Sequence, residues 1–334
     1  LSKLSGVHHY EERLLYMLML LRHTQTRVIF VTSQAISPTV IDYYLHLLAG
    51  VPTAHSRRRL LMLDCSDGSQ TPLSEKILRR PILLDRIREA LGDVNTAHMV
   101  CFNSTWRERT LAVRLGIPLY ANDPSLNFLG TKSGCREIFR SSGILFPDGF
   151  ENLQDEHQIA EALNILYDRN PKIKRAVVKL NDGFSGEGNA LFYYNDLSAF
   201  DSIERQKKIL QMLPNLRFEA PRETWPSYLE KYKEMEGVVE EFVEGENKES
   251  PSSQCRVNAI GEAVPISTHD QVLGGPSGQV FLGCTFPANI AYRLEIQEAG
   301  MLVARELASR GVMGRFATDF VSVPTEDGGF QHYA

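Results

Sequence analysis

Short apolar runs alternate with segments of helical spacing through the first 120 residues of the chain. The pattern predicts an amphipathic helix at residues 11–22, followed by strands at residues 27–32, 60–64, 97–102 and 117–120. Between these strands, apolar residues recur every three or four positions, which predicts helices at residues 38–48, 73–91 and 106–115. Strands that alternate with helices are typical of a mostly parallel sheet covered on both faces. We therefore expect a parallel α/β domain over residues 1–125.

From about residue 126 the order of the elements changes. Helical spacing predicts helices at residues 132–141, 156–167, 197–213 and 288–310. Strands are expected at residues 173–180, 190–194, 238–243, 254–260, 263–267 and 314–323, with a turn and strand at 143–147 and a last strand beginning at 330. Residues 214–235 mix proline, tryptophan and many charges, which predicts a connecting excursion. The chain as a whole is therefore assigned to the α/β class, with a second, α+β domain over residues 126–334.

Composition narrows the class of protein. The chain has 334 residues, of which 43% are hydrophobic and 23% charged, so it is expected to be a globular protein with two or three domains. A formal net charge of -5 argues against nucleic acid as the partner. The apolar run at residues 14–21 is too short to span a membrane. Five cysteines without a C-x-x-C pair predict neither a zinc site nor a disulfide framework, which suits the reducing cytoplasm.

The most informative segment is a strand that ends in a lysine and a glycine loop. Lys179 lies in an apolar run at residues 177–180, and glycines follow at positions 183, 186 and 188. Glycines let backbone N–H groups approach a polyphosphate closely, and the lysine adds positive charge, so the segment predicts a nucleotide clamp. The order differs from a Walker A loop, a Rossmann fingerprint and a kinase loop. An ordinary hairpin with a flexible turn remains the alternative.

The order of these parts resembles the ATP-grasp ligases. A helix beginning at Lys132, the Lys179 hairpin, an acidic segment at 240–243 and a late strand bearing Asp319 are similar to the branch that contains pheganomycin-type peptide ligases and the animal IQ-motif-containing protein H family. The resemblance covers residues 27–334, and its most specific block is residues 179–190. It implies a parallel pre-ATP-grasp domain at 1–125 and an ATP-grasp nucleotide-binding domain at 126–334.

The resemblance also implies how ATP would be held. Lys132 and Lys179 would reach the phosphates, as point charges suited to that task. The loop would fold over the phosphates through the backbone of Gly183, Ser185, Gly186 and Gly188. For Lys132 the alternative is an ordinary solvent-exposed lysine near a helix start.

An acidic segment is expected to form the hinge beside the adenine. By resemblance, its backbone would pair with the adenine edge, Phe242 would pack on the base, and an acidic side chain would approach the ribose. The residues concerned are Glu240, Glu241, Phe242, Val243 and Glu246. The alternative is a strand with one exposed acidic face, because backbone recognition places little demand on residue type.

The late strand carries the expected metal ligand. By resemblance Asp319 would bind Mg²⁺, which prefers carboxylate oxygens and would bridge to the phosphates. Its position between Phe316 and Val321 also suggests a buried carboxylate that needs a cation or partner. Arg256 and Arg315 would hold a substrate carboxylate or acyl phosphate, with a surface or ion-paired role as the alternative for each.

The sequence departs from a complete ATP-grasp site in one respect. Such sites add a Glu-x-Asn metal pair on the strand after the aspartate, and this chain ends at Ala334, where that strand is expected to begin. Its first residue is leucine, so we also expect the chain to start inside a longer protein. Without those ligands, phosphate charge would be poorly neutralised in the transition state. We expect nucleotide binding to survive better than turnover.

The leading hypothesis is an ATP-dependent carboxylate-amine (peptide) ligase that acts through an acyl phosphate, with ATP and Mg²⁺ as cofactors. The competing hypothesis is a non-catalytic nucleotide-binding or scaffold module of a calmodulin-linked protein of the sperm flagellum or cilium. Ile296 and Gln297 begin like a calmodulin-binding IQ motif but lack its basic-glycine arrangement, so calmodulin is expected to contact only regions outside these residues. No nucleic acid or membrane partner is expected. A kinase is disfavoured because no H-R-D-like catalytic loop is present.

Overall fold

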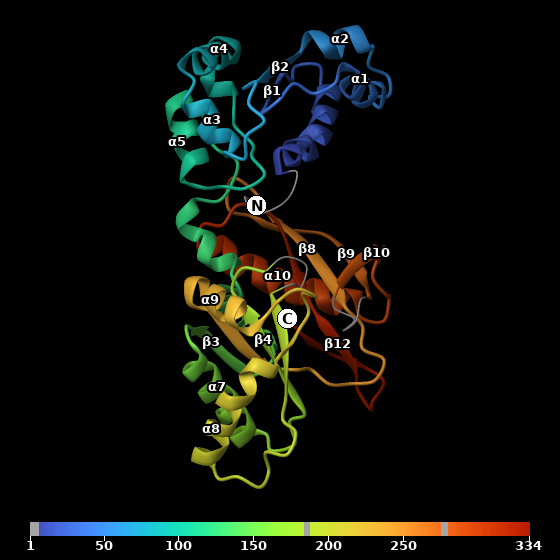
Figure 1. The fold of residues 1–334 in the computed structure, drawn as a ribbon. Coiled ribbons are helices and arrows are strands. Elements are labelled where there is room, and N and C mark those ends of the chain that lie inside the picture. The colour runs from blue at the N-terminus through green and yellow to red at the C-terminus, as the bar shows by residue number, and fades with distance from the viewer. Residues whose placement is uncertain (1–6, 184–187, 275–279) are drawn as a thin grey trace. The chain divides into compact units, whose positions relative to one another are not determined.

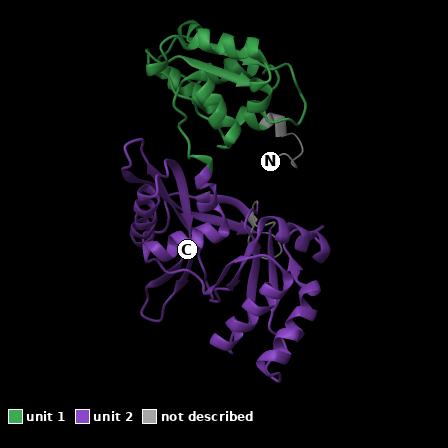
Figure 2. Cartoon of the chain, turned by 90° about the vertical axis from the view of Figure 1, so that its left-hand side faces the viewer, with its two compact units in different colours: residues 1–124 green, residues 125–334 purple. Residues whose placement is uncertain are grey.

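A computed structural model describes residues 7–183, 188–274 and 280–334 of the protein. The chain divides into two compact units, residues 1–124 and 125–334 (Figure 2). The predicted positions Ser185 and Gly186 lie outside the described residues.

Unit 1 is built around two short parallel strands. Its elements are η1 (Val7–Arg22), β1 (Val28–Thr32), α1 (Pro38–His46), α2 (Thr53–Arg58), β2 (Leu60–Asp64), α3 (Leu73–Leu78), α4 (Pro81–Leu91), η2 (Val94–Thr96) and α5 (Trp106–Leu115). β1 and β2 pair in parallel. Phe30 and Met62 pack with η1 and α1, whereas Val31 and Leu63 pack with α3, α4 and α5. Both faces of the strand pair are therefore covered, as expected for parallel strands.

Three details of unit 1 differ from the sequence-based predictions. The strands expected at 97–102 and 117–120 reduce to one parallel bridge between Met99 and Leu119. Pro118 lies beside this bridge and has no N–H to extend a ladder. The single helix expected at 73–91 breaks into α3 and α4 at Pro81, because a proline cannot continue the preceding helical hydrogen bonds. The opening helix is of the 3-10 type.

In its described residues, unit 2 contains two larger antiparallel sheets, a two-stranded antiparallel sheet, and the helices that cover the larger sheets (Figure 1). Its elements are η3 (Pro124–Gly130), α6 (Lys132–Ser142), β3 (Gly149–Leu153), α7 (Glu156–Arg169), β4 (Arg175–Leu180), β5 (Asn189–Tyr193), α8 (Ser202–Met212), η4 (Leu213–Asn215), β6 (Arg217–Phe218), α9 (Trp225–Met235), β7 (Gly237–Glu241), β8 (Pro251–Val257), β9 (Ala263–Gly274), β10 (Val280–Thr285), α10 (Arg293–Ser309), β11 (Gly314–Asp319), β12 (Val321–Pro324) and β13 (Phe330–Tyr333).

The first sheet has the strand order β3-β7-β4-β5-β6, and helices α7, α8 and α9 cover one face. The prediction of a connecting excursion at 214–235 is wrong, because this stretch forms η4's last residues, β6 and α9. Tyr228 and Tyr232, one turn apart on α9, are fully buried against the sheet. Together with Trp225 and Met235 they form the stripe of the helix that packs on the core.

The second sheet has the strand order β10-β9-β8-β11. Helix α10 lies on one face, where Gly300 lies so close to Ser253 that an added Cβ would be 2.4 Å from its hydroxyl oxygen. The predicted strand at 314–323 is interrupted at Phe320, which separates β11 from the β12–β13 hairpin. The strand expected at 143–147 is absent, and β3 begins instead at Gly149.

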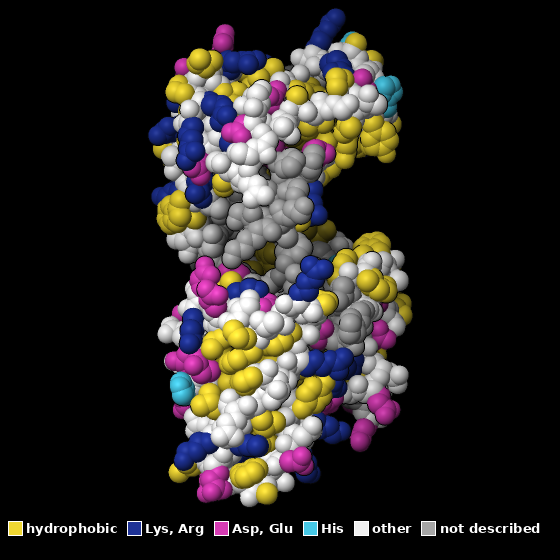
Figure 3. Space-filling view, in the orientation of Figure 1, with side chains coloured by type: hydrophobic (Ala, Val, Ile, Leu, Met, Phe, Trp, Pro, Cys, Tyr) yellow, Lys and Arg dark blue, Asp and Glu magenta, His cyan; other side chains and the backbone are white. Residues whose placement is uncertain are grey.

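On the face shown in Figure 3, basic and acidic side chains are interspersed over unit 2 and do not gather into a large area of one sign. Within the described ranges, no helix combines the length and apolar character needed to cross a bilayer.

Candidate functional site

Strand alternation places Lys179 on the face of the first sheet opposite its covering helices. Val178 and Leu180 belong to the core beneath α7 and α9, so the side chain between them points the other way. In the register with β7, Lys179 pairs with Val238 and Val177 pairs with Glu240. Glu240 is thus a diagonal neighbour on the same face, and its Oε2 forms an ion pair with Lys179 Nζ.

A buried asparagine brings Lys132 to the end of the Lys179 strand. The side-chain oxygen of Asn181 accepts hydrogen bonds from the Ser133 amide at 2.9 Å and the Ser133 hydroxyl at 2.8 Å. Its backbone oxygen accepts from the Lys132 amide at 3.2 Å. Asn181 therefore fixes the first turn of α6 against β4, and the two predicted phosphate-binding lysines belong to adjoining backbone segments. Sequence reasoning missed Asn181, although it directly follows the strand.

Two glycines close the base of the glycine loop. An added Cβ at Gly188 would lie 3.2 Å from the Gly183 Cα, which is tighter than ordinary van der Waals contact. The Gly188 carbonyl accepts the Leu180 amide at 3.0 Å, and the buried Tyr228 hydroxyl lies 3.0 Å from the same carbonyl. The two ends of the loop are thus held together directly beside Lys179. A side chain at either glycine would press on the other glycine's backbone, so the packing at this base favours glycine.

The side chains of Glu240 and Glu241, in the acidic hinge segment, have different partners. Glu240 faces Lys179, whereas Glu241 accepts a hydrogen bond from Asn170 Nδ2 at 2.9 Å. Beyond the strand, the Arg175 guanidinium and the Lys248 ammonium contact the Phe242 ring at 3.9 and 4.3 Å from its centroid. The packing of Phe242 on adenine stays a prediction.

Two further hinge positions lie past the end of β7. The Val243 carbonyl accepts a hydrogen bond from Lys248 Nζ at 2.8 Å. The Glu246 side chain is exposed. Within the described chain, neither Val243 nor Glu246 is bonded to Glu240 or Lys179. Their roles beside adenine and ribose stay predictions.

Glu240 is a buried carboxylate held between two cations. Its side chain is 9% exposed, and Oε1 accepts from Arg136 Nη1 at 2.9 Å while Oε2 pairs with Lys179. Burial opposes ionisation, but the neighbouring charges of Lys179 and Arg136 outweigh it and lower the pKa of the Glu240 carboxyl. The carboxylate is therefore ionised at neutral pH.

The second sheet carries the remaining predicted residues on the face that α10 leaves uncovered. Arg256 of β8 pairs directly with Arg315 of β11, and Ser252 pairs with Asp319 four residue pairs further along the two strands. The Arg256 Nε is buried without a hydrogen-bond partner in the described chain. Like charges opposite one another across two strands repel, so this pair is suited to receive an anion.

The prediction that Asp319 is buried is wrong. Its side chain is exposed, because alternation along β11 turns Thr318 inward and leaves Asp319 on the outer face. Its charge therefore needs no buried partner. Within the described part of the chain, no cluster of three or more His, Cys, Asp or Glu side chains is arranged to hold a metal ion.

The same face holds a polar row that sequence reasoning missed. His269 of β9 pairs with Ser252, which in turn pairs with Asp319, so the three side chains share one rung across three strands. In the next rung, Gln254 accepts from the Ser267 hydroxyl at 3.0 Å and donates to Ser252 at 2.9 Å. Alternating polar residues at 252, 254 and 256 were the sequence signal for this face.

One thiol lies within electrostatic reach of residues from both sheets. Burial raises the pKa of the Cys135 thiol, and the charges of Lys132, Glu240, Lys179 and Asp319 act on the same group. The predicted phosphate-binding lysines, the hinge carboxylate and the predicted metal ligand thus all lie near enough to this thiol to act on its charge. An arrangement of two cations and two carboxylates can accommodate a nucleotide triphosphate with a divalent cation.

The sequence of the chain matches a known protein family. The profile of a family described as "IQCH-like, ATP-grasp" matches residues 125–217 and 208–332. The chain belongs to this IQCH-like ATP-grasp family. The predicted family resemblance is thereby confirmed, and the profile covers all the predicted site residues of unit 2.

Two curated relatives of this ATP-grasp chain span most of its length. L-propargylglycine--L-glutamate ligase of Streptantibioticus cattleyicolor is 29% identical over 328 residues, which cover 96% of this chain and 65% of that protein. IQ motif-containing protein H of Danio rerio is 24% identical over 344 residues, which cover 90% of this chain and 32% of that protein. The chain thus spans less than two thirds of the length of either relative.

Solved structures confirm the predicted fold class. Biotin carboxylase of Campylobacter jejuni in complex with β-γ-ATP has a TM-score of 0.61 at 13% identity, covering 96% of this chain and 62% of that chain. The biotin carboxylase domain of Hydrogenobacter thermophilus 2-oxoglutarate carboxylase, with MgADP, ADP and bicarbonate, has a TM-score of 0.58 at 12% identity, covering 96% and 60%. At such identity the likeness shows the ATP-grasp fold alone.

Proposed function

We propose that the chain binds ATP and transfers its γ-phosphoryl group to a carboxylate, which an amine then attacks. The observation that carries the proposal is the bond of the Lys132 backbone to the end of the Lys179 strand, next to the closed base of the glycine loop. Asn181 sets the spacing of the two lysines through bonds that do not depend on a ligand. Preorganised positive charge at that point would stabilise the transferring phosphoryl group. The relative named as an L-propargylglycine--L-glutamate ligase supports an amide-forming reaction.

The hinge would hold the nucleoside end. We propose that the backbone of residues 240–243 meets the adenine edge, with Glu241, Phe242 and Val243 forming its wall, and that Glu246 approaches the ribose. β7 ends at Glu241, and the Phe242 amide still donates to the Arg175 carbonyl at 3.2 Å, so the assignment relies on the backbone groups past Phe242, which lie beyond the strand.

The arginine pair would hold the carboxylate substrate. Arg256 and Arg315 face the same side of the sheet as Asp319, and the buried Arg256 Nε needs an acceptor. One oxygen of the held carboxylate would attack the γ-phosphorus, and the bond to the ADP oxygen would break. The amine nitrogen would then bond to the acyl carbon, phosphate would leave, and the nitrogen would lose its proton to solvent. Arg256 and Arg315 would keep the acyl group in place through both steps.

Asp319 fits Mg²⁺ as a partner shared with the nucleotide. A single exposed carboxylate is a poor protein-only metal site, but Mg²⁺ typically takes one or two carboxylates and completes its shell with phosphates and water. When bound, the ion would neutralise phosphate charge and polarise the γ-phosphoryl group.

Calorimetric titration of Mg²⁺-ATP tests the binding proposal. We expect a micromolar-to-millimolar dissociation constant, and Lys179→Ala should weaken it about 10–100-fold because a charge-assisted bond to phosphate is lost. Lys233→Ala is the matched control, because Lys233 pairs with Glu156 at 3.1 Å on the helical side of the sheet. Equal affinity in the wild type and Lys179→Ala would contradict the proposal.

Turnover is tested separately by phosphate release in the presence of carboxylates and amines. Release that requires both co-substrates supports the ligase. A non-catalytic nucleotide-binding or scaffold module is the second candidate, and it is favoured because no group of three or more His, Cys, Asp or Glu side chains among the described residues is arranged to hold a metal ion. ATP binding without phosphate release would select that candidate. A cytoplasmic location, a sperm or ciliary role and calmodulin binding outside residues 1–334 stay predictions.

A further inference from the structure

The two oxygens of the Glu240 carboxylate hold two cations of unequal mobility. Arg136 reaches Oε1 from helix α6, and its side chain is 3% exposed. Lys179 reaches Oε2 from β4, and its side chain is 25% exposed. Glu240 therefore lies between a cation sealed in the protein and a cation open to the predicted nucleotide site.

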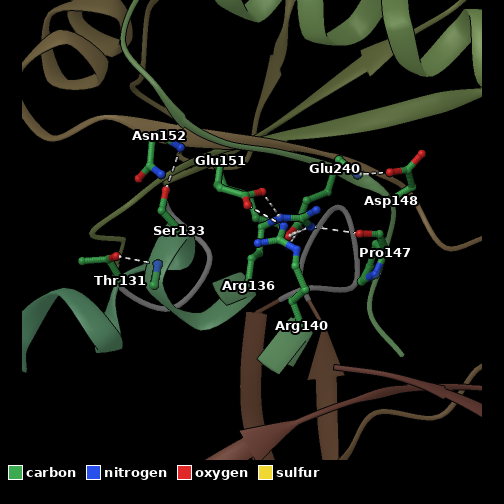
Figure 4. A network of polar contacts seen from close by, with 12 residues as sticks. Thr131, Ser133, Arg136, Arg140, Pro147, Asp148, Glu151, Asn152 and Glu240 are labelled. Atoms are coloured by element: carbon green, nitrogen blue, oxygen red, sulfur yellow. Dashed lines mark hydrogen bonds and ion pairs between the residues drawn. The ribbon is translucent and has the colours of Figure 1, made fainter. Parts of the chain in front are cut away.

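The Arg136 guanidinium donates hydrogen bonds to three different residues (Figure 4). Its Nη1 donates to Glu240 and to the Pro147 carbonyl, each at 2.9 Å, and its Nε donates to Glu151 Oε2 at 3.1 Å. The planar guanidinium suits this set of acceptors, which an ammonium group cannot match. Within the described chain, Lys179 is bonded through its side chain only to Glu240. Lys179 is thus the cation that can leave.

Nucleotide binding requires Lys179 to change partner. An arriving phosphate competes with Glu240 for the ammonium group, and departure of that group would leave a buried carboxylate that depends on its remaining cation. We propose that Arg136 is a positioning residue for nucleotide binding: it holds Glu240 ionised and in place while Lys179 moves from Glu240 to a phosphate oxygen. This inference rests on the proposed function and assigns a role to a residue that does not itself reach the nucleotide.

A substitution at Glu151 should change how strongly Arg136 compensates the charge of Glu240. It shares Arg136 with Glu240, and its other oxygen pairs with the exposed Arg140. Glu151→Gln would remove one negative charge from Arg136 while keeping an acceptor in place. More of the Arg136 charge would then compensate Glu240, and Lys179 would be released more easily. The two substitutions Arg136→Lys and Glu151→Gln should therefore change ATP affinity in opposite directions.

The experiment compares ATP with adenosine, which lacks phosphates, by calorimetric titration of the whole chain and its variants. Arg136→Lys should weaken ATP binding about five- to tenfold and leave adenosine binding unchanged, and Glu151→Gln should strengthen ATP binding about two- to fivefold. Arg205→Lys is the matched control: Arg205 is also buried and bonds Asn164 at 2.7 Å, but it lies between α7 and α8. It should change neither affinity.

The outcomes separate this inference from the proposed function. Failure of the wild type to bind ATP overturns both. If the wild type binds and Lys179→Ala weakens binding, unchanged ATP affinity in Arg136→Lys, or equal losses for ATP and adenosine, overturns the role of Arg136 alone. If Arg136→Lys does not fold, Glu151→Gln decides: tighter ATP binding supports the role, and unchanged or weaker binding overturns it. An equal ATP-selective loss in Arg205→Lys also overturns it.

Discussion

The two sheets of unit 2 treat their site charges differently. On the first sheet, the carboxylate of Glu240 forms ion pairs with both Lys179 and Arg136. On the second sheet, Arg256 and Arg315 face each other with no ion-pair partner in the described chain. A compensated charge is positioned by the protein itself, whereas an uncompensated pair is completed by an incoming anion. The ion pairs of Glu240 should therefore raise the free energy of unfolding, and the repulsion between Arg256 and Arg315 should lower it.

The largest expected effect tests the compensated side. Glu240→Ala should lower the free energy of unfolding by about 3–5 kcal/mol, because it removes the carboxylate that pairs with Lys179 and leaves the buried Arg136 with Glu151 as its remaining ion-pair partner in the described chain. Glu244→Ala is the matched control: Glu244 pairs with Arg175 at 2.8 Å but is exposed, so its loss should cost at most about 1 kcal/mol. Urea unfolding measures both. Equal losses would remove the distinction between the two sheets.

The same carboxylate should give a defined pH dependence. Its pKa is lowered in the folded state, so its stabilisation is fully present above the unfolded value of about 4.3 and is lost as pH falls through the folded value. The stability advantage of the wild type over Glu240→Gln should therefore stay constant from pH 8 to about pH 5.5 and narrow below about pH 4. An advantage that grows on acidification would show that Glu240 is not held as an anion.

A smaller effect is expected where the first sheet supports the glycine loop. Tyr228→Phe should cost about 1 kcal/mol, because the Tyr228 hydroxyl lies 3.0 Å from the carbonyls of Val178 and Gly188. Tyr232→Phe is its control on the same helix. The Tyr232 hydroxyl is buried with no partner in the described chain, so its removal should be neutral or slightly stabilising. Thermal unfolding measures the stability of the two variants. Equal losses of stability would show that the hydrogen bond of the Tyr228 hydroxyl does not stabilise the fold.

The smallest expected change in stability is at the Arg256–Arg315 pair of the second sheet. Arg256→Gln should raise the free energy of unfolding by up to about 0.5 kcal/mol, because it removes a like-charge neighbour of Arg315. Arg315→Gln should do the same, and the double variant should gain little more than either single one. A double-mutant cycle by urea unfolding measures the coupling. Losses above 1 kcal/mol in the single variants would indicate an unrecognised partner in the free protein.

Local signals in the sequence predicted much of this molecule. The Lys179 strand, helix α5 and the start of α6 follow from apolar periodicity and capping residues, and the ATP-grasp family follows from the order of the motifs. The missed elements depend on tertiary contacts. Helix α9 mixes charged residues with the stripe that contains Tyr228 and Tyr232, and strand β10 has no alternation of apolar and polar residues.

Part of the candidate site could not be predicted for the same reason. The bonds of Asn181 to Ser133 and of Arg136 to Glu240 join residues 48 and 104 positions apart. No local pattern marks such pairs. The predicted burial of Asp319 failed because its exposure is decided by which face of β11 meets α10, and the flanking aromatic residues do not reveal that face.

A crystal structure of the chain with Mg²⁺ and a non-hydrolysable ATP analogue tests the central claim most directly. The account predicts that the ammonium groups of Lys132 and Lys179 both lie within hydrogen-bond distance of phosphate oxygens, with Lys179 no longer paired with Glu240 and Arg136 still bonded to it. A nucleotide bound elsewhere, or a triphosphate that contacts neither lysine, would contradict the account.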